Sequence, residues 1–334
     1  MTPTTTIRDV AARAAVSAAT VSRVLNGRVD VAPDLRDRVL AAVAALNYRP
    51  NGAARSLRTR ATTVLGVIIS DITNPFFTSM VRGVEDAAQE AGYSVVLANT
   101  DEDLDKERRY VEVAAAEQMA GVVLSPASSS HTSISYLVER NIPVVTIDRR
   151  LRGAPVDSVT VNNFRAAFEA TEHLIAQGCR RIGFVAGPVT TTTGSRRLAG
   201  YKAALRAAGL PDDADLVVNG DFRIDGGRAA AAELLEQQID GLFVANNLMT
   251  IGALEELGSR GVEPGRDLAV VGFDDINWGT ALRPPLTAVS QPTYEIGQRT
   301  AELLLRRIRG EQLPLQRIVL PAKLVIRASS IRVR

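Results

Sequence analysis

The stretch VAARAAVSAATVSRVLNG, residues 10–27, consists mostly of small side chains, with a few hydroxyls and arginines and a closing Asn-Gly. Apolar positions recur at helical spacing through residues 6–47, and breaks fall at AVS, NGRVDVAP and NYRPN. This pattern predicts three short helices and leaves no room for a strand. We therefore expect the amino-terminal segment to fold as a small all-α unit.

The ends of these helices carry suitable capping residues. Thr6 with Asp9 can cap the first helix, and Ser17 can cap the second. Pro33 suits the first turn of the third helix, although Ala32 stands where a Ser or Asp cap would be expected. The absence of that cap puts in question how stable the segment is, rather than what it does.

The second helix is expected to present a surface of small side chains. We expect its inner face and that of the first helix to pack on the third helix through Ala12, Val16, Val21, Val24 and Leu25. The residues that would then project outward are Ser17, Ala18, Ala19, Ser22 and Arg23. Two helices joined by a tight turn, the second with mainly small outward side chains, predict a helix-turn-helix that can approach the major groove of DNA closely.

Charge supports this prediction. The chain has 334 residues and a net charge of +2, but residues 1–60 hold ten Arg, no Lys and four Asp, so they carry +6 and the remainder carries −4. A generic Ala-rich hairpin with solvated arginines is the alternative, and the basic charge together with the cap, turn and Asn-Gly stop favours DNA binding.

Each outward side chain suits a particular contact with DNA. Ala18 and Ala19 can meet a thymine methyl, and Arg23 can reach a guanine edge or a phosphate. Hydroxyl or amide groups that can bind phosphates are supplied by Ser17, Thr20, Ser22 and Asn26. Thr6 is a further candidate DNA-binding residue.

From residue 62 the pattern changes. Short apolar runs (VLGVII, SVVLAN, GVVLS, IPVVTID, RIGFVAG, GLFVAN and LAVVGFD) alternate with Ala-rich helical stretches. This alternation is typical of βαβ units and a parallel sheet. Between the two regions lies YRPNGAARSLRTR, a basic segment with proline and glycine, which is a linker candidate.

The segments TIRDVAARAAVSAATVSRVLNG and LNYRPNGAARSL resemble the headpiece and hinge of the lac repressor family of bacterial transcription regulators, and the rest of the chain resembles that family's sugar-binding core. The resemblance implies that Ala18, Ala19 and Arg23 read bases, and that a hinge helix forms on operator DNA. Within that hinge, Asn51 and Ala54 would contact DNA, and Leu57 would enter the minor groove. Gly52 departs from a good helix sequence at a cost of about 1 kcal/mol.

The resemblance also implies the domain organisation. A headpiece would span residues 1–50, a hinge 51–61, and an effector-binding and dimerisation core 62–334. The core would comprise two similar parallel-sheet subdomains of the periplasmic-binding-protein type, approximately 62–160 with 292–322, and 161–291 with 323–334. No leucine-heptad tail follows, so a homodimer on a palindromic operator is expected.

Polar and aromatic residues follow the predicted strands of the core. In an open α/β fold, ligands bind at the carboxyl ends of strands. The aromatic pair in the Asn-Pro-Phe-Phe string is more often core, but the Asn-Pro before it favours a loop, and exposed rings beside an amide suit a sugar. Each polar residue alone is compatible with a turn or surface position. Together they suit an uncharged ligand with vicinal hydroxyls.

These residues resemble the pocket of the periplasmic ribose-binding protein. The matching positions are Asn74, Phe76, Phe77, Asp148, Arg149, Arg197, Phe222, Asn246, Asp274 and Gln291. The resemblance implies a pentose effector, D-ribose first, with other pentoses, polyols or furanose forms as alternatives. It also implies a repressor that the sugar releases from DNA, although some relatives need their ligand in order to bind.

Other classes of protein fit the sequence less well. An enzyme would need a catalytic motif, yet the chain has two His residues and no phosphate-binding loop with its lysine. A transport protein would share the pocket but would carry a signal peptide and no basic headpiece. One cysteine, Cys179, makes a Cys-based zinc site unexpected, and neither a metal nor a cofactor is expected. The sequence therefore predicts a cytoplasmic DNA-binding repressor.

Overall fold

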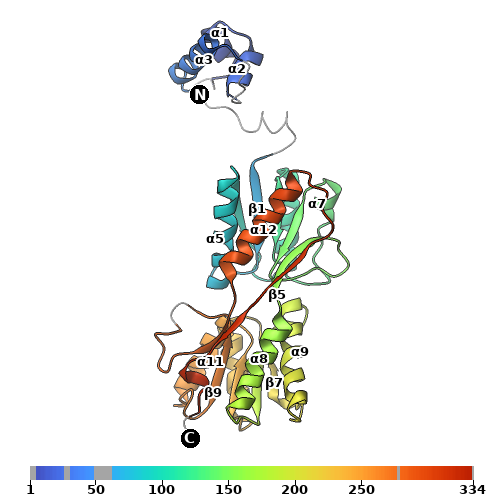
Figure 1. Cartoon of the computed structure of the whole chain (residues 1–334), viewed down its shortest axis with the longest axis vertical. Coiled ribbons are helices and arrows are strands. Elements are labelled where there is room, and N and C mark those ends of the chain that lie inside the picture. The colour runs from blue at the N-terminus through green and yellow to red at the C-terminus, as the bar shows by residue number, and fades with distance from the viewer. Residues whose placement is uncertain (1–4, 26–30, 49–61, 277–278, 333–334) are drawn as a thin grey trace. The chain divides into compact units, whose positions relative to one another are not determined.

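The computed structural model describes residues 5–25, 31–48, 62–276 and 279–332. The chain divides into two compact units, residues 1–62 and residues 63–334. Each unit has its own buried apolar cluster. The expected fold class, an all-α headpiece followed by an α/β core with two parallel-sheet subdomains, is confirmed (Figure 1).

The described part of the amino-terminal unit contains three helices: α1 Ile7–Ala14, α2 Ala18–Leu25 and α3 Pro33–Ala45. Thr6 forms a capping box with Asp9, as predicted. Ser17 Oγ accepts a hydrogen bond of 3.1 Å from the Thr20 amide, so Ser17 caps α2. Pro33 opens α3, and its N-cap residue, Ala32, makes no side-chain bond there.

The core of this unit differs from the prediction at one position. Val10, Ala11 and Ala14 are buried on α1, whereas Ala12 is exposed. Positions 7, 10, 11 and 14 share one face at helical spacing, and residue 12 lies outside that face. The prediction for Ala12 was therefore wrong. Val21 and Val24 are buried, and Val16 and Leu25 pack beside them.

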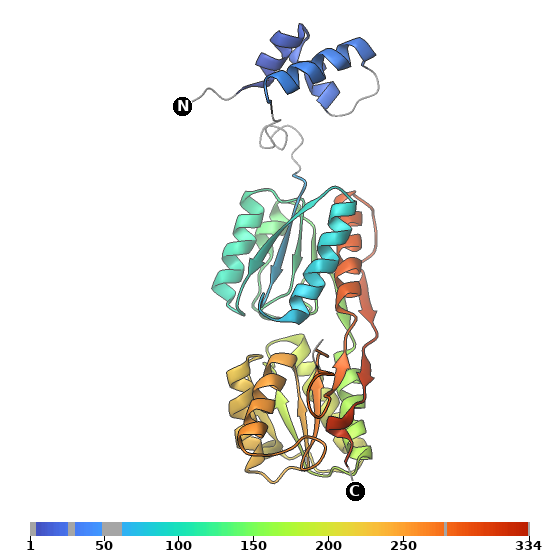
Figure 2. The ribbon, with the colours of Figure 1, turned by 90° about the vertical axis from the view of Figure 1, so that its left-hand side faces the viewer.

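The amino-terminal half of the core holds a six-stranded parallel sheet in the order β11-β5-β4-β3-β1-β2. Its strands are β1 Val64–Ile69, β2 Ser94–Asn99, β3 Gly121–Leu124, β4 Val144–Ile147, β5 Asp157–Val161 and β11 Arg317–Leu320. Its helices are α5 Pro75–Glu90, α6 Leu104–Ala116, α7 Ser135–Glu139 and α12 Thr293–Ile308. Helices cover both faces of this sheet (Figure 2).

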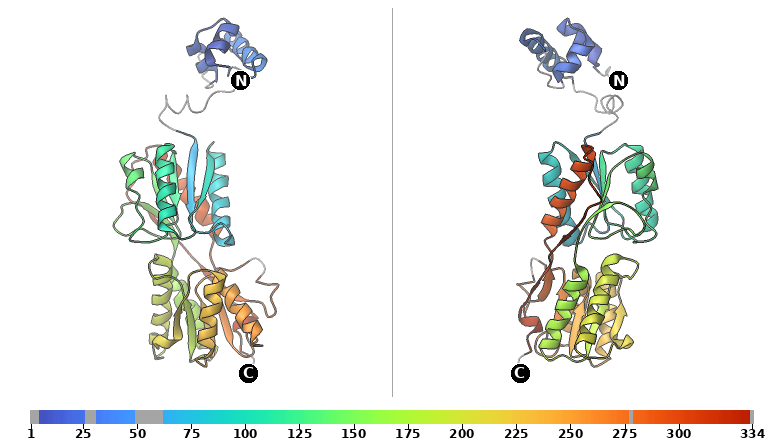
Figure 3. Two further views of the ribbon diagram at one scale, coloured as in Figure 1. Left: turned by 180° about the vertical axis from the view of Figure 1, so that it is seen from behind. Right: turned by 45° about the vertical axis from the view of Figure 1, so that its right-hand side comes forward.

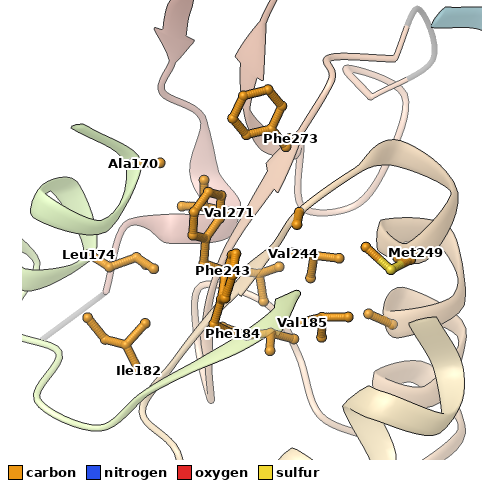
Figure 4. Close-up of a cluster of buried hydrophobic side chains, with 14 of the residues drawn as sticks. Ala170, Leu174, Ile182, Phe184, Val185, Phe243, Val244, Met249, Val271 and Phe273 are labelled. Atoms are coloured by element: carbon orange, nitrogen blue, oxygen red, sulfur yellow. The ribbon is translucent and has the colours of Figure 1, made fainter. Parts of the chain in front are cut away.

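The carboxy-terminal half repeats the arrangement in the order β12-β10-β9-β8-β6-β7, with β12 antiparallel to β10. Its strands are β6 Ile182–Ala186, β7 Val217–Asn219, β8 Gly241–Val244, β9 Ala269–Phe273, β10 Thr287–Ser290 and β12 Lys323–Val325. Its helices are α8 Asn163–Ala176, α9 Thr192–Ala207, α10 Ile224–Leu235 and α11 Asn247–Ser259, with short 3₁₀ turns η1 Ala214–Leu216 and η2 Ala328–Ser330. Figure 4 shows part of its core, where Phe184, Phe243 and Phe273 lie among aliphatic side chains.

Within the described residues, the chain passes between the two halves at three places. These lie between β5 and α8, between β10 and α12, and between β11 and β12 (Figure 3). Each half is consequently built from separate segments of the sequence. The two sheets have equivalent strand orders, 2-1-3-4-5-11 and 7-6-8-9-10-12, so each has a switch point at its carboxyl edge.

Candidate functional site

Helix α2 supplies the candidate DNA-reading surface of the amino-terminal unit. Ala19 and Arg23 are exposed and lie four residues apart, so they share one helix face. Ser17 is also exposed, and its hydroxyl lies 2.9 Å from that of Thr20. Ala18 is half-buried and packs against the apolar cluster, so less of it faces outward than the sequence suggested. Ser22 and Thr20 are half-buried as well.

The turn before α2 is fixed by a long-range contact. Ala15 ends α1 with φ 51°, a left-handed conformation that favours glycine. Arg38, from α3, donates to the Ala14 carbonyl at 2.6 Å and to the Ala15 carbonyl at 3.0 Å. These bonds satisfy carbonyls at the end of α1 and tie the turn before α2 to α3.

Four of the expected DNA-contacting residues lie outside the described residues: Asn26, Asn51, Ala54 and Leu57. Gly52 lies there too. Their roles stay predictions from the sequence.

The core contains a cleft at the carboxyl ends of strands from both sheets. Its lining encloses about 460 Å³, including the opening to solvent. The sequence-predicted residues that line it are Asn74, Phe76, Phe77, Asp148, Arg149, Arg197, Phe222, Asn246 and Asp274. The fold therefore brings nine of the ten predicted side chains, which are scattered over 200 positions of sequence, around one space.

Asn74 and the two phenylalanines begin helix α5 rather than forming the loop that the sequence suggested. Asn74 is the N-cap, its Oδ1 accepting from the Phe76 amide at 2.9 Å, and Pro75 occupies the first helical position. Phe76 and Phe77 are buried and packed edge to face, with ring centroids 5.2 Å apart. The expectation of exposed rings was wrong because both belong to the apolar cluster beside β1 while also lining the cleft.

Asp148 and Arg149 follow β4 and are both nearly inaccessible to solvent. Arg149 donates from Nη1 and Nη2 to the two carboxylate oxygens of Glu102, each at 2.6 Å, and from Nη1 to the Pro126 carbonyl at 3.0 Å. Its Nε lies 3.4 Å from Asp148 Oδ2 without hydrogen-bond geometry. Its guanidinium carbon lies 5.6 Å from the centre of the Phe222 ring, which comes from the other half.

Arg197 and Asp274 form the second charged group. Arg197 Nε donates to Asn163 Oδ1 at 2.7 Å, and its Nη1 donates to the Ala245 carbonyl at 2.6 Å and lies 3.9 Å from Asp274 Oδ2. The guanidinium stacks on Phe273, 3.6 Å from the ring centre. Gln291 does not line the cleft; its amide donates to Asp274 Oδ1, so it orients that carboxylate.

Asn246 and Phe222 complete the carboxy-terminal side. The Asn246 side chain caps α11 by accepting from the Met249 amide at 2.9 Å and donates to the Phe222 carbonyl at 3.0 Å. One amide hydrogen of Asn246 then remains for a ligand. Gly187 leaves room for the Phe222 ring, since a Cβ there would lie 2.1 Å from Phe222 Cε1.

Burial dominates the electrostatics of the cleft. It raises the pKa of Asp148 to about 6, against the opposing charges of Arg149 and Arg197. It also raises the pKa of Asp274 and lowers the pKa of Arg197. Burial alone would lower the pKa of Arg149, but the charge and hydrogen bonds of Glu102 hold that pKa above its ordinary value.

Hydrogen bonds join the two halves around the cleft. Asn247 Nδ2 donates to Asn74 Oδ1 at 2.8 Å. The Arg150 amide donates to Thr192 Oγ1 at 3.1 Å, and the Ser129 amide to the Thr190 carbonyl at 3.0 Å. Arg223 Nη2 donates to the Asp101 carbonyl at 3.0 Å. These bonds hold the halves in a closed arrangement.

Several lining residues were not expected from the sequence: Ser70, Asp71, Glu102, Thr193, Asp221 and Arg223. Ser70, Asp71 and Glu102 follow β1 and β2, so the strand-end rule that identified Asp148 and Asp274 could have found them. Asp221 and Arg223 flank the expected Phe222 directly.

Among the described residues, no helix is long and apolar enough to cross a membrane. Likewise, the described part of the chain places no group of three His, Cys, Asp or Glu side chains where they could hold a metal ion.

A helix-turn-helix unit joined to a two-sheet core with a polar cleft defines a DNA-binding regulator that responds to a small ligand. Residues 6–51 match the family described as bacterial regulatory proteins, lacI family, and residues 171–330 match the periplasmic binding protein-like domain. The chain belongs to the lacI family, as the sequence resemblance indicated.

Similar proteins include a ribose operon repressor from Halalkalibacterium halodurans, 39% identical over 98% of this chain and 97% of that protein. Among solved structures, a complex of the transcriptional regulator CelR with cellobiose is 36% identical, covering 97% of this chain and 99% of that one, with a TM-score of 0.75. The lac repressor dimer bound to operator and the anti-inducer ONPF is 28% identical over 98% and 100%, with a TM-score of 0.87.

Membership of this family makes the protein a transcriptional repressor with a sugar-binding core. The expectation that it is not an enzyme is confirmed by the same relatives, which are regulators.

Proposed function

We propose that the protein is a homodimeric repressor of a palindromic operator and that D-ribose, or a related pentose, binds in the core cleft and lowers its operator affinity. It would act in the cytoplasm, where its DNA target lies. The observation that carries the proposal is the convergence of nine sequence-predicted sugar-contacting residues on one cleft.

The chemistry of the cleft suits a small uncharged sugar. Asp148 and Asp274 offer acceptors to vicinal hydroxyls, and Arg149, Arg197 and Asn246 offer donors. Phe76, Phe77 and Phe222 supply apolar surface for the C–H faces of a sugar ring. The ribose operon repressor among the relatives supports a pentose, whereas the CelR complex keeps a larger sugar as an alternative.

The surface of α2 would read the operator. Ala19 and Arg23, together with Ala18, would face base edges, and Thr6, Ser17, Thr20 and Ser22 would bind the backbone. Asn26, Asn51, Ala54 and Leu57 complete the proposed DNA contacts. Two copies are needed because a symmetric operator presents two half-sites, and the lac repressor in the operator complex is a dimer.

Sugar binding in the cleft would be coupled to operator binding through closure of the core. A sugar that binds the closed arrangement better than an open one shifts the core toward closure, and operator affinity changes only as far as this difference in affinity allows. A ligand that instead strengthens DNA binding would make the sugar a co-repressor.

Isothermal titration calorimetry tests the ligand. The full chain is titrated with D-ribose, L-arabinose, D-xylose, D-glucose, D-galactose and cellobiose. We expect saturable binding of D-ribose, abolished in Asp274→Ala and retained in Asp105→Ala, whose side chain lies on the exposed face of α6. Binding of cellobiose in preference to every pentose would contradict the proposed ligand.

Fluorescence anisotropy tests how operator affinity responds to the sugar. An operator is first selected from a random duplex library with the sugar-free protein, and its affinity is then measured with and without D-ribose. A loss of affinity of at least tenfold is expected. DNA binding that requires ribose would contradict the proposal that the sugar lowers operator affinity.

A further inference from the structure

Glu102 enters the cleft from a tightly fixed loop after β2. Asp101 and Glu102 both have left-handed backbone, with φ 55° and 62°. Asn99 Nδ2 donates to Asp101 Oδ1 at 2.7 Å, Lys106 pairs with the other Asp101 oxygen, and Asp103 caps α6. This scaffold fixes the backbone beside Glu102, whose carboxylate faces Arg149.

Glu102 binds both nitrogens of one edge of the Arg149 guanidinium. A guanidinium has five N–H donors. Two of these bind the Glu102 carboxylate and a third binds the Pro126 carbonyl, while Nε is buried without a hydrogen-bond partner among the described residues. The paired Nη1–Nη2 edge, which binds phosphate or carboxylate in two-pronged fashion, is therefore already taken.

The charges of the cleft lining also disfavour binding of a phosphate group. Among the described residues, its lining contains five carboxylates and three guanidiniums. The carboxylates are Asp71, Glu102, Asp148, Asp221 and Asp274, and the guanidiniums are Arg149, Arg197 and Arg223. Arg197 is engaged by Asn163 and Ala245, and Arg223 by the Asp101 carbonyl. A phosphate group entering this cleft would meet excess negative charge, and it would find the Nη1–Nη2 edge of Arg149 already bound to Glu102.

We propose that Glu102 determines specificity: by occupying Arg149 it makes the cleft accept uncharged pentoses and exclude their phosphate esters. This proposal rests on the proposed pentose-binding function and names the chemical form of the effector. The regulator then responds to the free sugar, and a phosphoryl-transfer reaction on that sugar removes the signal.

Calorimetry with matched ligands tests the exclusion. D-ribose 5-phosphate is compared with 5-O-methyl-D-ribose, an uncharged ether that is equally restricted to furanose ring forms. In the wild-type protein we expect the phosphate ester to bind at least 100-fold more weakly than the ether. Glu102→Gln keeps the side-chain shape, removes its charge and leaves one acceptor oxygen in place of two, so one Arg149 nitrogen loses its bond to residue 102. We therefore expect this ratio to fall at least tenfold.

Two further variants separate charge from structure. Glu102→Asp keeps the carboxylate and should retain the exclusion of the phosphate ester. Glu85→Gln removes the charge of an exposed glutamate paired with Arg82 on α5, and should leave every affinity unchanged. A ratio in Glu102→Gln equal to the wild-type ratio, or equal affinity of the wild type for ester and ether, would overturn the proposal.

Inorganic phosphate provides a test that does not depend on the identity of the sugar. We expect 10 mM phosphate to raise the thermal midpoint of Glu102→Gln but not those of the wild type or Glu102→Asp, at matched ionic strength. If the wild type binds no pentose, the proposed effector is wrong, and this experiment still decides the role of Glu102. An equal effect on all three proteins overturns it.

Discussion

Besides Glu102, three residues that line the cleft have left-handed backbone. Asp148, Phe222 and Asp274 have φ 65°, 65° and 68°, which costs about 1–3 kcal/mol for each residue that is not glycine. All three follow strands, and at these positions the turn directs the side chain into the cleft. Local strain of this kind is typical of ligand-binding sites, so these positions reflect binding more than stability.

Asp148 should make the stability of the sugar-free core depend on pH. Its pKa rises from an ordinary value of 3.8 to about 6 on folding, so the folded state binds the proton more tightly than the unfolded state. The stabilisation is fully present below pH 4 and is lost as pH rises through 6. The rise corresponds to about 3 kcal/mol.

Asp148→Asn removes this contribution, so its free energy of unfolding relative to the wild type should increase by up to about 3 kcal/mol between pH 4 and pH 7.5. Urea denaturation at both pH values measures the difference. The groups facing Asp148, namely Arg149, Arg197, Asp274 and Glu102, are present in both proteins. A difference that does not change with pH would contradict the assignment.

Gly187→Ala should weaken sugar binding without unfolding the core. The new Cβ would lie 2.1 Å from the Phe222 ring, which must move out of its position beside Arg149. We expect at least a tenfold loss of D-ribose affinity by calorimetry. Gly258→Ala is the matched control, because a Cβ there has no neighbour within 4 Å. Equal affinity in the two variants would mean that Phe222 does not contact the sugar.

Arg23→Ala should reduce specific DNA binding by about 1–3 kcal/mol if Arg23 makes a bidentate contact with a base. Its exposure on the same face as Ala19 makes such a contact possible. Anisotropy on the selected operator and on random duplex measures the two losses. An equal loss on both would assign Arg23 to a phosphate instead.

At the scale of elements, the turn between α1 and α2 combines an unfavourable residue with a compensating contact. Ala15 has φ 51°, and Arg38 binds the carbonyls of Ala14 and Ala15. Glycine adopts this conformation without the steric penalty that a Cβ brings. Ala15→Gly should therefore stabilise the amino-terminal unit by about 1 kcal/mol.

Hydrogen–deuterium exchange of the full chain measures that change as slower exchange of α1 and α2 amides. Ala12→Gly serves as the control, since it places glycine at an exposed position inside α1 and should speed exchange in the same helices. Faster exchange in Ala15→Gly would show that the turn is not strained.

Elements were predictable from sequence where a short-range rule governs them. The capping box at Thr6, the cap at Ser17 and the central strands follow from local composition and pattern. The strand-end rule could have placed Glu102 at the cleft, but its pairing with Arg149 depends on backbone angles after β2 that no residue type in TDED reveals. Asn74 and Asn246 show a related limit, because both line the cleft and each also caps a helix. The sequence alone does not show which atoms of each side-chain amide cap the helix and which face the cleft.

At the scale of the whole molecule, the two units have separate apolar clusters. Residues 63–334 contain both sheets and every described residue that lines the cleft. A fragment beginning at Thr63 should therefore bind D-ribose within a factor of three of the full chain and should show no specific DNA binding. Calorimetry and anisotropy measure the two properties. Operator binding by this fragment would place the DNA-reading surface in the core.

The three passages of the chain between the halves constrain how the protein is made. Strand β11, at residues 317–320, completes the first sheet beside β5, and β12, at residues 323–325, completes the second beside β10. Neither sheet can be finished on the ribosome until nearly the whole chain has been synthesised, whereas α1 to α3 emerge early. A premature stop near residue 290 would consequently leave both halves without an edge strand, while the helices that read DNA would be intact.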